Sequence, residues 1–267
     1  MRTPLEPARH TAPDTAMVTG ATAGIGAAFV EQLAATGHDL VLVARDVARL
    51  EAAAARLRAE HGVAVEVLAA DLSDREQTRR VVDRAGSREH PVDVLVNNAG
   101  FGLPETFPGS SPADEEAMLD VLVRAPLLVS QAAANAMVER GRGAVITVSS
   151  VASFLPLGTY SAAKAWATTF SESLAANLAG TGVTATAVCP GYVRTEFHER
   201  AAITVARQPW PLWGSPTMVA RAGLRGAARG RAVVVPGLLY SSAVLLVRLT
   251  PRGPWRSFAA GRDAASR

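Results

Sequence analysis

The chain has 267 residues, of which 49% are hydrophobic and 19% are charged, so it can fill a large core and is not disordered by composition. Its net charge of +3, without a long basic run, argues against a nucleic-acid-binding protein. A single cysteine, Cys189, excludes an internal disulfide framework, and five scattered histidines lack the spacing of metal ligands, so no metal site is predicted.

The two ends of the sequence lack the pattern of a targeting or membrane segment. Residues 1–13 combine prolines and charges without an apolar stretch, so we expect a flexible tail rather than a signal peptide, in a cytoplasmic protein. Residues 232–249 are strongly apolar, but Pro236 and Gly237 interrupt them, which predicts a buried strand followed by a helix and no integral membrane span. We expect one domain over residues 14–250 and a tail over residues 251–267.

Short Val- and Ala-rich runs alternate with longer amphipathic segments. Strands are predicted at 15–20, 39–44, 63–70, 92–97, 143–149, 183–189 and 232–236. Helices are predicted at 24–36, 47–60, 74–85, 113–140, 160–180 and 216–229. Ser73 and Glu76 have the spacing of a capping box for the third of these helices. Strands that are apolar on both faces and separated by helices indicate an α/β fold with a parallel sheet covered on both sides.

The first predicted strand runs directly into the sequence TGATAGIG, which contains Gly20, Gly24 and Gly26. Glycines at a strand-to-helix turn permit a tight bend and let a pyrophosphate approach the backbone at the helix N-terminus. The spacing differs from the usual G-x-G-x-x-G of dinucleotide-binding turns. A plain strand-to-helix turn is therefore the alternative interpretation.

The second predicted strand ends in Ala44 and Arg45. A site for NAD(H) places an acid here for the ribose hydroxyls, whereas an arginine can pair with the 2′-phosphate of NADP(H). We therefore expect NADP(H) rather than NAD(H), with a solvated surface arginine as the alternative. Asp46 is expected to cap the following helix and not to bind ribose.

Lys164 is the only lysine in a chain whose other basic side chains are arginines, and it stands four residues after Tyr160. This spacing places both side chains on one face of a helix. At an effective dielectric of about 20, unit charges about 4 Å apart interact by about 4 kcal/mol, so the ammonium would lower the pKa of the phenol by roughly three units before desolvation opposes it. A compact ammonium with three donors also fits where the planar fork of arginine does not.

With these stretches in place, the sequence resembles the classical short-chain dehydrogenase/reductase family over about residues 15–200. The matching motifs are TGATAGIG, Asp71-Leu72 after the third strand, NNAG at 97–100, Tyr160-x3-Lys164 and PGYVRT at 190–195. The resemblance implies a Rossmann-type, doubly wound, mainly parallel sheet of seven strands in the order 3-2-1-4-5-6-7. It also implies cofactor contacts from Gly20, Thr22, Ala23, Gly24, Ile25, Gly26, Arg45, Asp71, Leu72, Asn98, Ala99, Gly100, Tyr160, Lys164, Pro190, Gly191, Val193 and Thr195.

Some of these residues carry a specific implied contact. The resemblance gives Asp71 a hydrogen bond from the adenine amino group, although an ordinary loop aspartate is the alternative. It places Val193 and Thr195 beside the nicotinamide carboxamide and the phosphates. For Asn97, Asn98 and Gly100, a structural role at the end of the fourth strand is as reasonable as contact with the adenosine half.

The resemblance further implies that Ser150, rather than Ser149 or Ser153, completes a catalytic set with Tyr160 and Lys164. Ser150 would hydrogen-bond the substrate carbonyl, Tyr160 would donate a proton to its oxygen, and Lys164 would lower the pKa of Tyr160 and hold the nicotinamide ribose. The implied reaction is the NADP(H)-dependent interconversion of a ketone and a secondary alcohol. A serine that only caps backbone groups is the alternative for Ser150.

Two features depart from the family pattern. Tyr160 follows Ser150 by only ten positions, fewer than the family usually has. Leu122 occupies the position of the usual catalytic asparagine, whose main-chain carbonyl is associated with a water relay to the lysine. Because Pro126 cannot donate a helical hydrogen bond to the carbonyl of Leu122, we hypothesise that it preserves the water site, with a simple helix kink as the alternative.

Residues 193–230 are the least family-like part of the sequence. An apolar lid over a lipophilic ketone is expected here, or else ordinary packing of a helix, from Phe197, Trp210, Pro211, Leu212, Trp213 and Met218. Family members commonly associate through two long helices beside the active site, so a homodimer or homotetramer is expected. Because of Leu122 and the short loop, a catalytically idle NADP-binding sensor or scaffold is the alternative function.

Overall fold

The computed structural model describes residues 14–105, 107–196, 213–251, 253 and 255. Its centre is a parallel seven-stranded sheet in the order β3-β2-β1-β4-β5-β6-β7, which confirms the predicted fold class and strand order. The strands are β1 (Thr15–Thr19), β2 (Asp39–Ala44), β3 (Val65–Ala69), β4 (Val94–Asn97), β5 (Gly143–Val148), β6 (Val183–Val188) and β7 (Val233–Val234).

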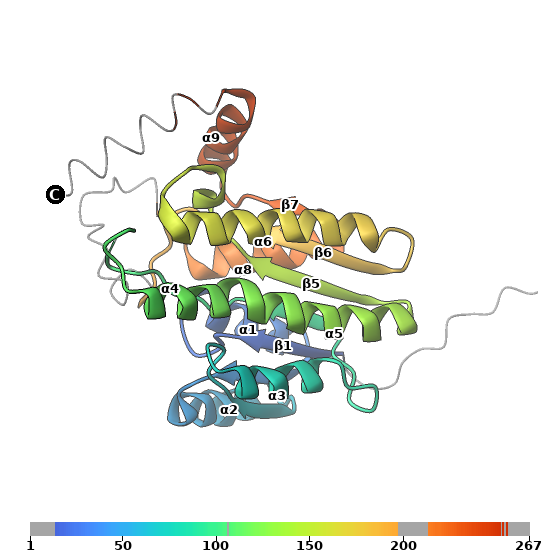
Figure 1. Cartoon of the computed structure of the whole chain (residues 1–267). Coiled ribbons are helices and arrows are strands. Elements are labelled where there is room, and N and C mark those ends of the chain that lie inside the picture. The colour runs from blue at the N-terminus through green and yellow to red at the C-terminus, as the bar shows by residue number, and fades with distance from the viewer. Residues whose placement is uncertain (1–13, 106, 197–212, 252, 254, 256–267) are drawn as a thin grey trace, which may run out of the picture.

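Helices cover both faces of the sheet (Figure 1). The helices α1 (Gly24–Ala35), α2 (Val47–His61) and α8 (Pro216–Ala228) contribute to one core, and α3 (Arg75–Ala85), α5 (Ala125–Arg140) and α6 (Gly158–Asn177) contribute to the other. The remaining elements are α4 (Pro112–Leu119), the π-helical turn η1 (Asp120–Arg124), the 3-10 turn η2 (Val151–Phe154) and α9 (Leu238–Leu249).

The central strands are apolar on both faces because they supply both cores. In β1, Ala16 and Val18 belong to the core under α1, whereas Met17 belongs to the core under α5. Successive side chains of a strand point to opposite faces, so a strand buried on both sides cannot alternate apolar and polar residues. This arrangement explains why continuous apolar runs predicted the strands.

The helix caps confirm one prediction and contradict another. Asp46 caps α2, and its carboxylate accepts a hydrogen bond from the Arg49 backbone at 3.0 Å. The predicted capping box of Ser73 with Glu76 is wrong, because Asp74 is the N-cap of α3 and accepts from the Glu76 and Gln77 backbone N–H groups. Ser73 instead donates its hydroxyl to Asp71 at 2.7 Å.

The C-terminal strand and helix were expected to be a buried strand and a following helix. The elements are present, but β7 has only two residues, both half-buried, because it lies at the sheet edge with β6 as its one neighbour. Helix α9 lies at the top of Figure 1 and exposes most of its leucines. The prediction of a buried strand is therefore wrong, whereas the prediction of a following helix is confirmed.

Helices α4, η1 and α5 follow one another as a continuous helix from Pro112 to Arg140. Within the described part of the chain, it is the segment long and apolar enough to cross a membrane by length and composition alone, with a mean hydropathy of 1.4. However, 56% of its most apolar stretch is buried inside the fold. Its apolar character therefore belongs to the core that it forms with the sheet.

Candidate active site

The glycine-rich turn is built by close backbone contacts at the carboxyl end of β1. A β-carbon on Gly26 would lie 2.1 Å from the Gly20 carbonyl oxygen and 2.4 Å from Asn98 Nδ2, so only glycine fits there. The Asn98 amide donates to the carbonyl oxygens of Thr19 at 2.9 Å and Gly20 at 3.1 Å. The TGATAGIG and NNAG motifs thus form one rigid unit.

The PGYVRT stretch lies against the same turn. Gly24 has a φ of +55°, and a β-carbon there would come within 2.9 Å of Thr195 Cγ2. Val193 is buried, whereas Thr22 and Ile25 on the turn are half-buried. The structure therefore brings together the stretch predicted to bind the pyrophosphate and the stretch predicted to lie beside the nicotinamide end.

Arg45 and Asp71 lie side by side at the ends of β2 and β3. The Arg45 side chain is 70% exposed, and its Nη1 is 3.7 Å from Asp71 Oδ2. Burial acts to raise the pKa of Asp71, but hydrogen bonds from Ser73 and the charge of Arg45 outweigh it and lower that pKa. An exposed cation thus stands beside an ionised carboxylate, with Leu72 buried behind them.

The short loop after β5 still brings Ser150 to Tyr160. Ser150 caps η2, and its Oγ accepts a hydrogen bond from the Ala152 backbone at 3.1 Å. Burial raises the pKa of Tyr160 above its ordinary value, and a hydrogen bond from Ser150 opposes part of that increase. Ser149 points elsewhere, because its hydroxyl donates to the Lys164 carbonyl oxygen at 2.8 Å.

Lys164 is only 6% exposed, and its ammonium group is hydrogen-bonded to the end of β5. Its Nζ donates to the Val148 carbonyl oxygen at 2.7 Å and lies 5.8 Å from the centroid of the Tyr160 ring. Burial lowers the pKa of Lys164 to about 8. The expectation of a lowered Tyr160 pKa is wrong for the net shift, because desolvation of the phenol dominates and raises this pKa above its ordinary value.

Leu122 lies inside the wide π-helical turn that precedes Pro126. In this turn the Ala125 backbone donates to the Asp120 carbonyl oxygen, five residues back. The Leu122 side chain is 2% exposed and belongs to an apolar cluster against which Tyr160 packs. The position of the usual asparagine therefore lies next to Tyr160, and Leu122 presents apolar atoms there.

Two contacts around this site were not foreseen from the sequence. Glu115 in α4 accepts hydrogen bonds from Ser110 at 2.6 Å and from Thr159, next to Tyr160, at 3.0 Å. Arg49 in α2 donates to Glu196, which follows the PGYVRT motif, at 3.1 Å. The Glu115–Thr159 and Arg49–Glu196 contacts join residues far apart in the sequence, so no local pattern indicates them.

The predicted lid region is described only at its two ends. Val193 and Gly214 form a parallel bridge, and the Gly214 backbone donates to the Tyr192 carbonyl oxygen at 2.8 Å. Trp213 packs its ring 5.9 Å from that of Tyr192. Phe197, Trp210, Pro211 and Leu212 lie outside the described residues, so the lid stays a prediction.

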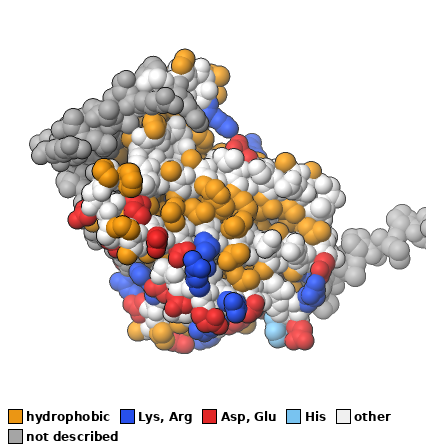
Figure 2. Space-filling model, viewed as in Figure 1, with side chains coloured by type: hydrophobic (Ala, Val, Ile, Leu, Met, Phe, Trp, Pro, Cys, Tyr) orange, Lys and Arg blue, Asp and Glu red, His pale blue; other side chains and the backbone are white. Residues whose placement is uncertain are grey.

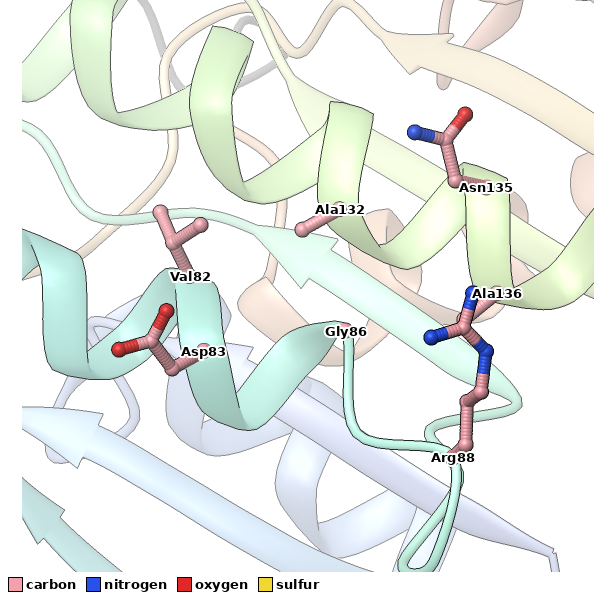
Figure 3. Close-up of a pocket in the computed structure, with 7 residues that line it drawn as sticks. All are labelled: Val82, Asp83, Gly86, Arg88, Ala132, Asn135 and Ala136. Atoms are coloured by element: carbon pink, nitrogen blue, oxygen red, sulfur yellow. The ribbon is translucent and has the colours of Figure 1, made fainter.

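Two other features of the described surface are not part of this site. A hollow of about 330 Å³ lies between α3 and α5, with Asp83 and Arg88 at its opposite ends (Figure 3), and none of the candidate site residues lines it. A group of Glu31, Glu60 and His61 has side-chain atoms within 4.8 Å of one another. Its two carboxylates are already bound by Arg56, which argues against a metal ion there.

Comparison with known proteins gives the class to which this site belongs. Residues 14–205 match the model of the short chain dehydrogenase family. A short chain dehydrogenase of Pseudocercospora fijiensis is 38% identical over 193 residues, which are 68% of this chain and 60% of that relative. The chain therefore belongs to the classical short-chain dehydrogenase/reductase family, whose members are oxidoreductases.

Two solved structures have the same fold over most of this chain. A short-chain dehydrogenase from Sphingobium yanoikuyae in complex with NADPH is 34% identical, with a TM-score of 0.80, covering 90% of this chain and 97% of that one. A bulky-bulky ketone specific alcohol dehydrogenase from Comamonas testosteroni is 29% identical, with a TM-score of 0.76, covering 91% and 97%.

Proposed function

We propose that the protein is an NADP(H)-dependent oxidoreductase that interconverts a lipophilic ketone and a secondary alcohol. The observation that carries this proposal is the juxtaposition of Ser150, Tyr160 and the buried Lys164 at the sheet edge that holds the glycine-rich turn. The relative from Sphingobium yanoikuyae, whose structure contains NADPH, supports the choice of cofactor.

The chain's residues fit a dinucleotide. The turn at Gly20, Gly24 and Gly26 leaves no room for a β-carbon, so a phosphate group could approach its backbone N–H groups at the start of α1. Arg45 is exposed where a 2′-phosphate is expected, and Asp71 lies beside it to accept a hydrogen bond from adenine. Thr195 and Val193 would contact the nicotinamide end. When bound, the cofactor supplies or removes the hydride.

The protonation states of the site favour proton donation by Tyr160. Because burial raises its pKa, the phenol is protonated at neutral pH and can donate to a carbonyl oxygen. Ser150 would donate a second hydrogen bond to the same oxygen. Lys164 carries a positive charge below about pH 8, and this charge would stabilise the phenolate left when the proton departs.

Two further features support the substrate class and an assembly. Leu122 and its apolar cluster border Tyr160, which suits a ketone with apolar substituents, as does the likeness to a bulky-bulky ketone specific alcohol dehydrogenase. Figure 2 shows hydrophobic side chains gathered over α5 and α6. Leu127 and Val138 of α5 are among the exposed hydrophobic residues. This face suits a homodimer or homotetramer built through the two long helices.

The proposed role of Tyr160 is tested by Tyr160→Phe with NADPH and a panel of ketones, following absorbance of the reduced nicotinamide. We expect turnover to fall by about 10³-fold or more, because the proton donor is lost. NADPH binding, measured by fluorescence titration, should change less than about threefold. Turnover retained in the variant contradicts the role of Tyr160. A wild-type protein that binds NADPH but reduces no ketone in the panel would favour the idle sensor or scaffold.

A further inference from the structure

Helix α9 presents its most apolar side chains away from the protein. Its leucines are between 54% and 89% exposed, and these are Leu238, Leu239, Leu245, Leu246 and Leu249. Their spacing of i, i+1, i+7, i+8 and i+11 places them on one face of the helix. Val244 is the one buried residue of α9, so the leucine face of this helix points to solvent and not to the core. Such a leucine-rich face indicates an interaction surface.

The opposite face fixes α9 to the protein next to the active site. The Tyr240 ring occupies the space beside Gly191, where a β-carbon would come within 2.0 Å of it, and the Tyr240 hydroxyl accepts a hydrogen bond from the Tyr192 backbone at 3.1 Å. Arg248 pairs with Glu172 of α6 at 3.1 Å and lies over the Phe154 ring. The leucine face is therefore held in a defined orientation.

The dimensions of this face distinguish between its possible occupants. Twelve residues of helix are about 18 Å long, too short to cross a hydrocarbon core of about 30 Å. A stripe about 18 Å long and about 10 Å wide is also far below the roughly 800 Å² per partner of a stable protein interface. A lipid surface requires no such area, because an amphipathic helix can lie within it and bury only its apolar face.

The sequence of α9 and of the residues that follow it indicates the kind of lipid surface. No acidic residue occurs in α9, and residues 248–267 of the sequence contain five arginines and one aspartate. Trp255 follows the helix, and its indole N–H donates to Thr250 Oγ1 at 2.7 Å. Basic residues beside an apolar helix are attracted to anionic headgroups, and tryptophan favours the membrane–water interface.

We propose that α9 is a docking helix that attaches the protein to the surface of an anionic lipid bilayer. The exposed leucines enter the outer part of the hydrocarbon, and the arginine-rich sequence that follows the helix is attracted to the headgroups. Because the inner face of α9 packs on the PGYVRT turn and η2, this attachment holds the active-site side of the protein near the membrane surface. The proposal does not depend on the reaction that the protein catalyses.

The test is flotation of the purified full chain with vesicles of phosphatidylcholine alone and with about 30% phosphatidylserine. The wild type is expected to bind the anionic vesicles at least tenfold more strongly, and binding should weaken as salt rises from about 50 to about 500 mM. Leu245→Ser combined with Leu246→Ser should reduce binding to the anionic vesicles by at least tenfold. Because both side chains are exposed, the melting temperature should stay within a few degrees.

The matched control is Ala55→Ser combined with Ala59→Ser, at two exposed positions of α2. It introduces the same two hydroxyl groups away from α9 and should bind vesicles like the wild type. No binding of the wild type to either vesicle, or equal binding by the leucine variant, overturns the proposal. A leucine variant that changes the mass measured by sedimentation in solution, with vesicle binding unaffected, also overturns it and identifies a second copy of the chain as the occupant.

Discussion

The glycine-rich turn and the Lys164 site lie at the same edge of the sheet but are maintained by different physical effects. At the turn, the backbone of Gly20 and the amide of Asn98 occupy the space that any side chain on Gly26 would need. At Lys164, a charge is kept in a buried position at a cost in desolvation, offset by the Val148 carbonyl. The turn is a packing requirement of the fold, whereas the lysine opposes stability. Substitutions at the two places should therefore change stability in opposite directions.

The largest effect is expected from Gly26→Ala. The added methyl group would lie 2.1 Å from the Gly20 carbonyl oxygen and 2.4 Å from the Asn98 side-chain amide. That amide is itself hydrogen-bonded to the carbonyl oxygens of Thr19 and Gly20. We expect the free energy of unfolding to fall by about 3 kcal/mol or more and NADPH binding to be lost. Urea unfolding and fluorescence titration measure the two quantities.

The control for this substitution is Gly253→Ala, because a β-carbon there meets no atom within 4 Å. It should leave both the unfolding free energy and NADPH affinity unchanged. A Gly26→Ala protein as stable as the wild type would show that the turn can relax, and the contrast with Lys164 would fail.

Lys164→Met should raise the free energy of unfolding at neutral pH, whereas Gly26→Ala lowers it. The pKa of Lys164 is about 8 in the fold against 10.5 for an unperturbed lysine, a difference that corresponds to about 3 kcal/mol of unfavourable burial. Loss of the hydrogen bond to Val148 offsets about 1 kcal/mol of the gain. We expect the variant to be about 2 kcal/mol more stable at pH 7, although its turnover falls.

The pH dependence of stability tests whether the buried charge of Lys164 causes the difference between the wild type and Lys164→Met. Below about pH 8, both folded and unfolded states hold the lysine proton, so the cost of burial is complete. Between about pH 8 and 10.5 the unfolded state binds more protons, and the wild type gains stability relative to the variant as pH rises. Melting curves at pH 7 and pH 10 measure this convergence. A variant that is less stable than the wild type at pH 7 would contradict the account.

The contrast between the two places also explains what the sequence could predict. The strands and the glycine turn follow from local patterns, because each depends on residue types at fixed spacings. The strand order and the pairing of Ser150 with Tyr160 came instead from the resemblance to a known family. The pKa of Tyr160 was predicted in the wrong direction, since desolvation depends on everything packed around the phenol. The contacts of Glu115 with Thr159 and the outward leucines of α9 depend on tertiary packing and leave no local signal.

Arg45→Ala should produce a smaller effect that is confined to the cofactor. A charge-assisted contact with a 2′-phosphate contributes about 1.5–3 kcal/mol, so the preference for NADPH over NADH in kcat/KM should fall at least tenfold. The control is Arg79→Ala on α3, whose side chain is 71% exposed against 70% for Arg45. An unchanged preference in Arg45→Ala would make Arg45 an ordinary solvated arginine.

The smallest effect is expected from Pro126→Ala. This variant tests whether Pro126 keeps the Leu122 carbonyl free for a relay water, although Leu122 replaces the usual asparagine. An alanine restores the backbone N–H that could close a helical hydrogen bond on the Leu122 carbonyl, and the π-helical turn would shift toward regular helix. Stability should change by less than about 1 kcal/mol, because the new hydrogen bond offsets the smaller buried side chain. If the free carbonyl holds a relay water, kcat should fall several-fold with KM unchanged.

The control is Pro112→Ala, at the first turn of α4 where a proline frees no carbonyl, and it should leave kcat intact. Because a mere kink would alter the melting temperature without altering kcat, an unchanged kcat in Pro126→Ala assigns the proline to helix geometry alone.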